Sequence, residues 1–166
     1  AFSLAPPFQR DDWESALSRV PPKVREEWQA SADDMAENPV QEYIDFGKWA
    51  VFLTGRMHSQ GIPIGAGTDT PILLAVPGYS LHSELEYLVR AGLSPLEALR
   101  SATVRPAEFF ALQDEMGTID TGKKADLVLL DANPLQEIAN TRKIAGVVTK
   151  GVFYERDSLL ARADTK

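Results

Sequence analysis

The stretch GIPIGAGTDTP, residues 61–71, joins a compact apolar run to a polar loop. Residues 62–66 are predicted to form a short buried strand, because they lie between Gly61, which can end a helix, and a turn rich in glycine, threonine and proline. Asp69 then follows the carboxyl end of this strand. Since ligands of α/β folds bind at that end of the strands, Asp69 is the first candidate for chemistry.

Helices are predicted before this stretch. Residues 11–20 carry apolar side chains at helical spacing, and residues 23–37 form a polar, acidic helical stretch that ends before Asn38-Pro39. In residues 40–60 the apolar positions recur every three or four residues, which predicts a long, packed helix. Residues 2–4 are predicted to form a short strand that ends at the prolines that follow.

The chain returns to helices after the loop. Ser80 is expected to cap a helix that ends before Gly92, with Leu81, Leu85 and Leu88 as its buried stripe. The polar loop therefore leads from the predicted strand into another helix, as in an α/β unit.

A capping box marks the start of the next helix. In the run SPLE, residues 94–97, serine and glutamate have the capping-box spacing, and proline stands at the first helical position. This pattern predicts short helices over residues 96–103 and 106–112. Beyond Gly117 the pattern predicts a second structural unit, with strands at 118–119, 125–130, 144–149 and 152–153 and short helices at 135–140 and 158–163.

The composition is typical of a globular protein large enough to bury a core, with 166 residues, of which 44% are apolar and 25% charged. A net charge of -7 disfavours nucleic acids and anionic membranes as partners. The absence of cysteine excludes disulfides, thiolate metal sites and cysteine nucleophiles. No apolar run approaches the roughly 18 residues needed to cross a bilayer. Together with the negative charge, this means that neither a membrane nor a nucleic acid is an expected partner.

Asp69 has two interpretations from its position. Its carboxylate could bind a divalent cation and accept a proton from a metal-bound water, whose pKa such a metal can lower to roughly 7. Alternatively, it could cap the turn or the following helix. A dinucleotide-binding loop at Gly65-Ala66-Gly67 is excluded by spacing, because the third glycine of that motif would fall on Thr70.

Two further residues follow on the next predicted helix. His82 and Glu84 are expected on its first turn, where either could face a substrate. The alternative is a solvated turn in which the helix dipole favours Glu84. Because the sequence contains only two histidines, it cannot supply a three-histidine zinc site by itself.

Several short motifs recur in a fixed order between residues 61 and 151. They are GIPI and GTD at 61–69, LHSEL at 81–85, AGLSPLEAL at 91–99, AT at 102–103, RPA at 105–107, GTI at 117–119, GKKADLV at 122–128 and NPL at 133–135. In this order they resemble the C-terminal region of the metal-dependent amidohydrolase superfamily, nearest to the branch of imidazolonepropionases and prolidase-like enzymes. Arg105 departs from the pattern, since these families more often place an asparagine there.

The resemblance implies an α/β fold that is the C-terminal part of a (β/α)8 TIM barrel plus strands of a small composite β-sandwich. Residues 1–112 would contain the last strands and helices of the barrel, and residues 113–166 would contribute to the sandwich. Residues 62–66 would be the last barrel strand. Asp69 would be a catalytic residue and a metal ligand, and Asp126 would have a structural role in a turn.

The implied activity is metal-dependent hydrolysis of C–N bonds in a small-molecule substrate such as an amide, a cyclic amide or a dipeptide. The expected cofactor is a divalent metal, with zinc favoured over iron, nickel or manganese. Its other ligands would lie upstream of residue 1, so this chain alone is expected to be inactive. Thr70, Pro71 and His82 are the expected substrate-binding residues.

A noncatalytic interaction or structural module derived from such an enzyme is the alternative. A chain that folds cooperatively as a monomer would favour the module, because the predicted strand would otherwise expose edges and apolar faces. Association into a homo-oligomer would favour a piece of an enzyme.

Overall fold

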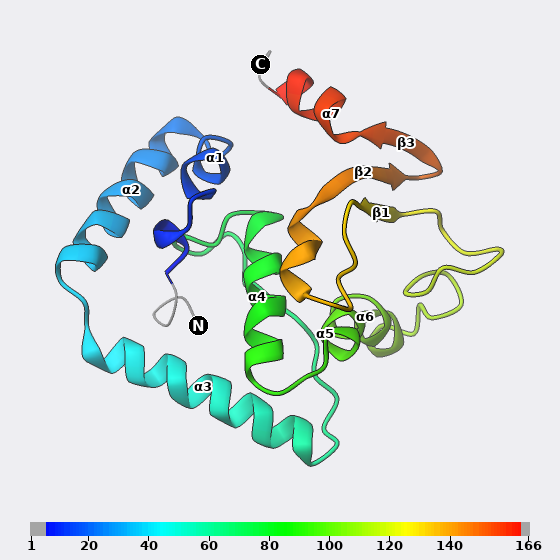
Figure 1. Ribbon diagram of the computed structural model, residues 1–166, viewed down its shortest axis with the longest axis horizontal. Helices are drawn as coiled ribbons and strands as arrows, with labels where there is room; N and C mark the ends of the chain where they lie inside the picture. Colours follow the sequence, from blue (N-terminus) through cyan, green and yellow to red (C-terminus); the bar gives the residue numbers. More distant parts are fainter. Residues whose placement is uncertain (1–5, 164–166) are drawn as a thin grey trace. The chain divides into compact units, whose positions relative to one another are not determined.

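The computed structural model describes residues 6–163, so the predicted strand at residues 2–4 lies outside the described part. The chain divides between Leu93 and Ser94 into two compact units (Figure 1). The predicted boundary between residues 112 and 113 concerns the domains of a whole enzyme and stays a prediction.

The described part of the first unit is helical. Its elements are η1 (Pro7–Gln9), α1 (Trp13–Leu17), α2 (Pro22–Glu37), α3 (Gln41–Ser59) and α4 (Tyr79–Arg90). The predicted helices at residues 11–20, 23–37 and 40–60 are thereby confirmed, with ends that differ by a few residues.

Two of these helices end in the same hydrogen-bonded motif. After α3, the Ile62 N–H donates to the carbonyl oxygen of Met57 at 3.1 Å, and the Gly61 N–H donates to that of His58 at 2.9 Å. This Schellman arrangement needs a left-handed residue, which glycine adopts without steric cost, and Gly61 has a φ of 75°. Leu93 closes α4 in the same way, so the predicted helix ends at Gly61 and Gly92 are confirmed.

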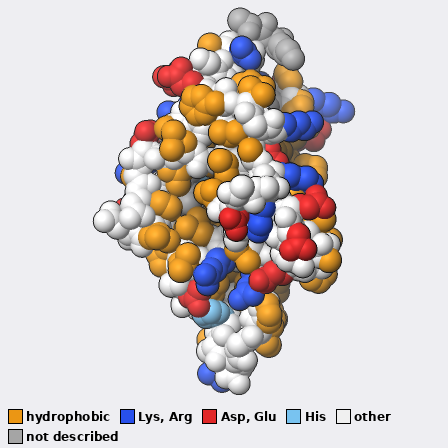
Figure 2. Space-filling view, turned by 90° about the vertical axis from the view of Figure 1, so that its right-hand side faces the viewer, with side chains coloured by type: hydrophobic (Ala, Val, Ile, Leu, Met, Phe, Trp, Pro, Cys, Tyr) orange, Lys and Arg blue, Asp and Glu red, His pale blue; other side chains and the backbone are white. Residues whose placement is uncertain are grey.

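The prediction that α3 is packed along its whole apolar stripe is wrong for the described residues. Tyr43, Phe46 and Trp49 are 63%, 62% and 54% exposed, whereas Gly47 is buried. No element of the described part covers these three side chains. The close contact of α3 with the end of α4 is at Gly55 instead. Hydrophobic side chains at the surface are visible in Figure 2.

The contact between α3 and α4 depends on a glycine. A Cβ atom added to Gly55 would lie 2.2 Å from the carbonyl oxygen of Ala91, which follows the last residue of α4. Real Cβ atoms do not come this close to a backbone oxygen, so the absence of a side chain at position 55 allows the two backbones to meet.

The predicted buried strand at residues 62–66 is not formed. This segment has no regular secondary structure, and its residues are exposed or half-buried. A strand needs a neighbour that accepts and donates its backbone hydrogen bonds, and no neighbouring strand exists in the described part of the first unit.

The predicted start of α4 also needs correction. The helix begins at Tyr79, with Gly78 rather than Ser80 at the N-cap position. Ser80 lies inside the helix, and its buried hydroxyl has no hydrogen-bond partner among the described residues. Leu85 and Leu88 are buried as predicted, whereas Leu81 is 37% exposed.

The second unit begins with the predicted capping box. Ser94 N–H donates to Glu97 Oε2 at 2.8 Å, and Glu97 N–H donates to Ser94 Oγ at 3.3 Å. These bonds satisfy backbone donors that have no partner inside the helix. They start α5 (Pro95–Ser101), which is followed by α6 (Val104–Phe109). Arg105 lies within α6, where it pairs with Glu108 at 2.8 Å and does not act as a cap.

A three-stranded antiparallel sheet completes this unit. Its strands are β1 (Leu127–Leu130), β2 (Ile144–Thr149) and β3 (Val152–Glu155), in the order β1-β2-β3. The helix η2 (Ile138–Arg142) lies between β1 and β2, and α7 (Arg156–Ala163) follows β3. Three of the four predicted strands are therefore confirmed, and the one at residues 118–119 is wrong, since those residues pair with no strand in the described part.

Asp126 fastens the turn between β2 and β3. Its Oδ1 accepts the backbone N–H of Lys150 at 2.8 Å, and Gly151 N–H donates to the carbonyl oxygen of Ala125 at 3.1 Å. Lys150 and Gly151 both have positive φ, as a tight hairpin turn requires. The carboxylate is therefore structural, as predicted, but the turn that it fastens is the one at Lys150 and Gly151, not a turn formed by residues 124–126.

The sheet also contains a close approach between a side chain and a backbone. A Cβ atom at Gly146 in β2 would lie 2.6 Å from the ring of Phe153 in β3. The aromatic ring thus lies directly over the glycine.

Among residues 6–163, no helix is both long enough and apolar enough to cross a membrane.

We expect Gly55→Ala to destabilise the first unit. Forcing extra volume into a tight contact costs about 1–3 kcal/mol, which exceeds the roughly 1 kcal/mol that alanine gains over glycine inside a helix. Denaturant unfolding and amide hydrogen exchange in α3 measure the loss. Gly65→Ala is the matched control, because nothing lies within 4 Å of a Cβ at that position. A Gly55→Ala chain as stable as the parent would contradict the proposed close contact.

Candidate functional site around Asp69

Asp69 lies on an exposed loop between α3 and α4. Its backbone is left-handed, with a φ of 53°, which aspartate tolerates better than most residues. The Ile72 N–H donates to the carbonyl oxygen of Asp69 at 3.1 Å and closes a turn. The exposed carboxylate is accessible to a ligand, and the turn fixes the backbone that carries it.

The threonines on either side of Asp69 hydrogen-bond to each other. The hydroxyls of Thr68 and Thr70 are 2.8 Å apart, and Thr70 Oγ1 also lies 3.3 Å from the carbonyl oxygen of Ala75. The peptide bond between Thr70 and Pro71 is cis. Two of the predicted substrate-binding residues, Thr70 and Pro71, are thus next to Asp69 in an exposed turn.

A hydrophobic cluster holds the segment after Asp69. Leu74 and Val76 are 2% and 3% exposed and pack in one cluster with Trp13 of α1 and Trp28 of α2. The cluster also contains Ala16, Leu17, Val20 and Ala32. Residues distant in sequence therefore fix the loop. The two indole rings are the largest side chains of this cluster.

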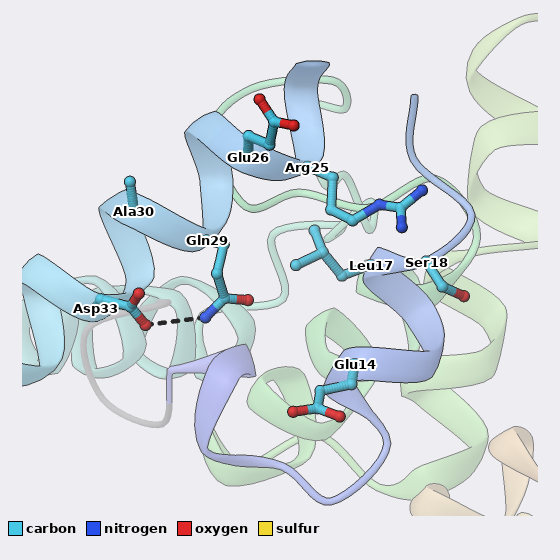
Figure 3. A pocket seen from close by; sticks show the side chains of 8 residues that line it. All are labelled: Glu14, Leu17, Ser18, Arg25, Glu26, Gln29, Ala30 and Asp33. Carbon is cyan, nitrogen blue, oxygen red and sulfur yellow. Dashed lines mark hydrogen bonds between the residues drawn. The ribbon is translucent and has the colours of Figure 1, made fainter. Parts of the chain in front are cut away.

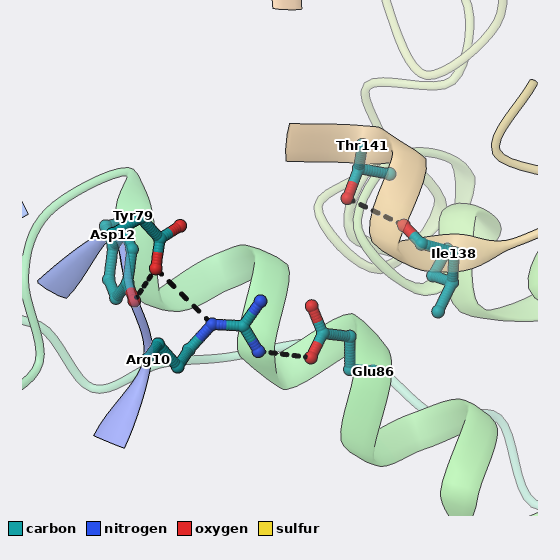
Figure 4. A network of polar contacts seen from close by, with 6 residues as sticks. All are labelled: Arg10, Asp12, Tyr79, Glu86, Ile138 and Thr141. Carbon is teal, nitrogen blue, oxygen red and sulfur yellow. Dashed lines mark hydrogen bonds and ion pairs between the residues drawn. The ribbon is translucent and has the colours of Figure 1, made fainter. Parts of the chain in front are cut away.

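A polar network joins the segment before α1 to α4 (Figure 4). Arg10 Nη1 donates to Glu86 Oε2 at 2.9 Å, and its Nε lies 3.5 Å from Asp12 Oδ1. The Tyr79 hydroxyl donates to the same Asp12 oxygen at 2.7 Å. These contacts fix α4 relative to the segment before α1. The helix α4 follows the Asp69 loop in the sequence.

Glu84 faces the chain just before Asp69. The Gly67 N–H donates to Glu84 Oε1 at 3.5 Å, a long hydrogen bond. Burial raises the pKa of the Glu84 carboxyl above its ordinary value, and the bond from Gly67 partly opposes this shift. The interpretation of Glu84 as part of a solvated first turn is therefore wrong: it is the sixth residue of α4 and half-buried.

The two histidines lie on different helices. His82 is half-buried on the first turn of α4, and His58 is half-buried on the last turn of α3. His82 remains a predicted substrate-binding residue.

The residues present fit only part of a metal site. Among residues 6–163, no group of three or more His, Cys, Asp or Glu side chains could hold a metal ion. The carboxylate of Asp69 is an oxygen donor of the kind that divalent metals accept, so it could provide one ligand. A complete site needs further ligands from elsewhere.

A separate groove of about 530 Å³ runs between α1 and α2 (Figure 3). Its lining includes Arg25, whose Nε is buried without a hydrogen-bond partner in the described part. The other lining residues are Glu14, Leu17, Ser18, Glu26, Gln29, Ala30 and Asp33. The groove shares no residue with the Asp69 loop, and the sequence patterns gave no signal for it.

The sequence profile of the amidohydrolase family matches residues 53–153. A 5'-deoxyadenosine deaminase from Methanobrevibacter smithii is 35% identical over 79 residues, which are 43% of this chain and 18% of the relative. An imidazolonepropionase from Streptococcus gordonii is 33% identical over 82 residues, or 46% of this chain and 25% of the relative. The chain therefore spans a quarter or less of the length of these curated relatives.

Solved structures show the same partial match. A putative prolidase from Bifidobacterium longum is 38% identical, with a TM-score of 0.57, over 67% of this chain and 30% of the other. A bottromycin amidohydrolase is 26% identical, with a TM-score of 0.68, over 90% of this chain and 34% of the other. These likenesses support an α/β fold.

We expect Glu84 to make the fold less stable as the pH rises. Below the ordinary pKa of glutamate, both the folded and unfolded chains hold the proton. Between this pKa and the raised pKa of the folded state, the unfolded chain has released its proton while the folded chain still holds it. The free energy of unfolding therefore falls as the pH rises through this range.

Urea unfolding at a series of pH values measures this effect. Glu84→Gln should match the parent in acid and be more stable at neutral pH. Glu37→Gln, at an exposed position at the end of α2, controls for the chemical change. A Glu84→Gln variant with the same pH profile as the parent would refute the assignment.

Proposed function

The chain belongs to the amidohydrolase family, and from this premise we propose that it is the C-terminal part of a metal-dependent hydrolase of C–N bonds in small molecules. The observation that carries the proposal is the family match over residues 53–153, which includes the Asp69 loop. The names of the similar proteins support this reaction class, because they include a deaminase and an amidohydrolase. Amides, cyclic amides and dipeptides are the proposed substrates.

Asp69 is the proposed catalytic residue and metal ligand. Its exposed carboxylate would be one of the ligands that hold a divalent metal, and it would accept the proton that the attacking water loses. The metal, when bound, supplies an acidified water with a pKa of about 7 and polarises the bond to be cleaved. The left-handed backbone of Asp69 and the turn to Ile72 hold the carboxylate in place for this transfer.

Zinc is the proposed metal, although a site of histidines and carboxylates also suits iron, nickel or manganese. A catalytic zinc site usually has three protein ligands. We propose that the ligands besides Asp69 belong to parts of the enzyme outside this chain, in keeping with the short span of the matches among the relatives.

The proposed fold of the whole enzyme is a (β/α)8 barrel with a composite β-sandwich. In it, residues 62–66 pair as the last barrel strand, and the exposed stripe of α3 packs against the rest of the barrel. The unpaired segment and the exposure of Tyr43, Phe46 and Trp49 support this proposal. The sheet of β1, β2 and β3 then contributes to the sandwich, with the domains divided between residues 112 and 113.

Thr70, Pro71 and His82 are the proposed substrate-binding residues. Thr70 and Pro71 follow Asp69 directly and are exposed, and His82 lies on the helix that the loop enters. A substrate held by the metal would therefore lie close to these side chains.

We expect Asp69→Asn and Asp69→Ala to lower kcat/KM of the complete enzyme by about 100- to 10,000-fold, because the proton acceptor is lost. Steady-state kinetics on an amide or dipeptide substrate and metal content by elemental mass spectrometry measure the change. Asp114→Asn is the matched control, since Asp114 is an exposed aspartate outside the loop. Full activity in both Asp69 variants would rule out the proposed role.

We expect this chain by itself to show no hydrolase activity and to retain no divalent metal after exhaustive dialysis, since one carboxylate cannot form the site. Elemental mass spectrometry of the parent and of Asp69→Ala tests the second point. About one equivalent of metal in the parent, lost in the variant, would show that a site forms without further sequence, across a homo-oligomer. An inactive chain that folds as a stable monomer would instead favour the noncatalytic module.

A further inference from the structure

The chain around Asp69 is held from both sides. Downstream, the turn from Asp69 to Ile72 and the burial of Leu74 and Val76 fix the loop. Upstream, Gly67 and Thr68 lie beyond residues 62–66, so backbone pairing of the proposed strand would not reach them. A hydrogen bond from Gly67 N–H to Glu84 Oε1 links this upstream side to α4.

We propose that Glu84 is a positioning residue that holds the Gly67–Asp69 backbone and thereby aims the Asp69 carboxylate. The inference rests on the proposed function of Asp69. Glu84 acts through the backbone of Gly67, two residues before Asp69, and is not proposed to touch the substrate.

The location of Glu84 suits this role. It lies between buried Leu85 and the half-buried residues of the preceding turn, on a helix fixed to α1 by the Arg10–Glu86 and Tyr79–Asp12 contacts. A rigid helix gives the acceptor a defined position. An ionised acceptor also makes a stronger hydrogen bond than a neutral one.

Gly67 has no side chain that could anchor it in another way. Nothing lies within 4 Å of a Cβ at this position, so packing does not fix residue 67. Loss of the carboxylate would remove the side-chain contact of Gly67, which lies beyond the proposed strand at residues 62–66, and would let the backbone next to Asp69 shift. A shift of about 1 Å at a reacting group can cost 100-fold in rate.

The test compares three substitutions in the complete enzyme. Glu84→Ala removes the acceptor and should lower kcat by about 10- to 100-fold with KM little changed, as loss of a supporting contact does. Glu84→Gln keeps an acceptor oxygen and should recover most of the loss. Glu86→Gln, on the same helix, keeps an acceptor for Arg10 and should behave as the parent.

A second readout follows the contact without catalysis. In this chain, Glu84→Ala should move the amide signal of Gly67 in NMR spectra and speed its hydrogen exchange, whereas Glu86→Gln should not. An unchanged Gly67 amide in Glu84→Ala would overturn the proposed contact. If Glu84→Ala fails to fold, Glu84→Gln still tests the proposal. A Glu84→Gln enzyme with kcat reduced 100-fold would show that the charge of Glu84 matters, and it would overturn the positioning role.

The failures of the two proposals are distinguishable. Activity retained by Asp69→Ala overturns the proposed function, whatever the Gly67 signal does. Activity retained by Glu84→Ala in an enzyme that requires Asp69 overturns the positioning role alone.

Discussion

The hydrophobic cluster that joins α1 and α2 to the segment after Asp69 is the interaction on which the first unit depends. Trp13 and Trp28 bring indole rings from two helices onto Leu74 and Val76, so that a loop without regular secondary structure acquires a buried side. The polar contacts of Arg10 and Tyr79 lie beside this cluster and orient α4. Apolar packing downstream and, as we propose, Glu84 upstream therefore hold the loop in this chain, where residues 62–66 have no neighbouring strand.

The exposed parts of the first unit have a common explanation. The aromatic stripe of α3 and the unpaired residues 62–66 are apolar surfaces that folding normally buries, at a gain of about 25 cal/mol per Å². Neither is covered in the described part of the chain. We propose that the barrel of the whole enzyme covers both surfaces, with residues 62–66 as the strand that carries Asp69 to the mouth of the site.

Local sequence signals were enough to predict most helices and strands. Features that depend on contacts between distant residues could not be predicted from the sequence. The capping box at Ser94, the glycines that end α3 and α4, and the strands on either side of Lys150 are set by neighbours in sequence, so their patterns were sufficient. The start of α4 was missed because Gly78 takes the N-cap position ahead of Ser80, and the resulting shift moved Glu84 from a solvated turn to a half-buried one. Asp69 was found as a candidate from its place after an apolar run. Its anchors at Trp13, Trp28 and Glu84 lie too far along the chain for any spacing rule to connect them.

The ring of Phe153 over Gly146 restricts how this sheet can vary. A methyl group at position 146 would meet the ring and also, at 2.8 Å, the backbone oxygen of Tyr154, so a smaller residue at 153 would not make room for it. Position 146 therefore requires glycine whatever side chain stands at 153. For protein engineering, residue 153 can be varied around a fixed glycine, whereas the glycine itself is best left as it is.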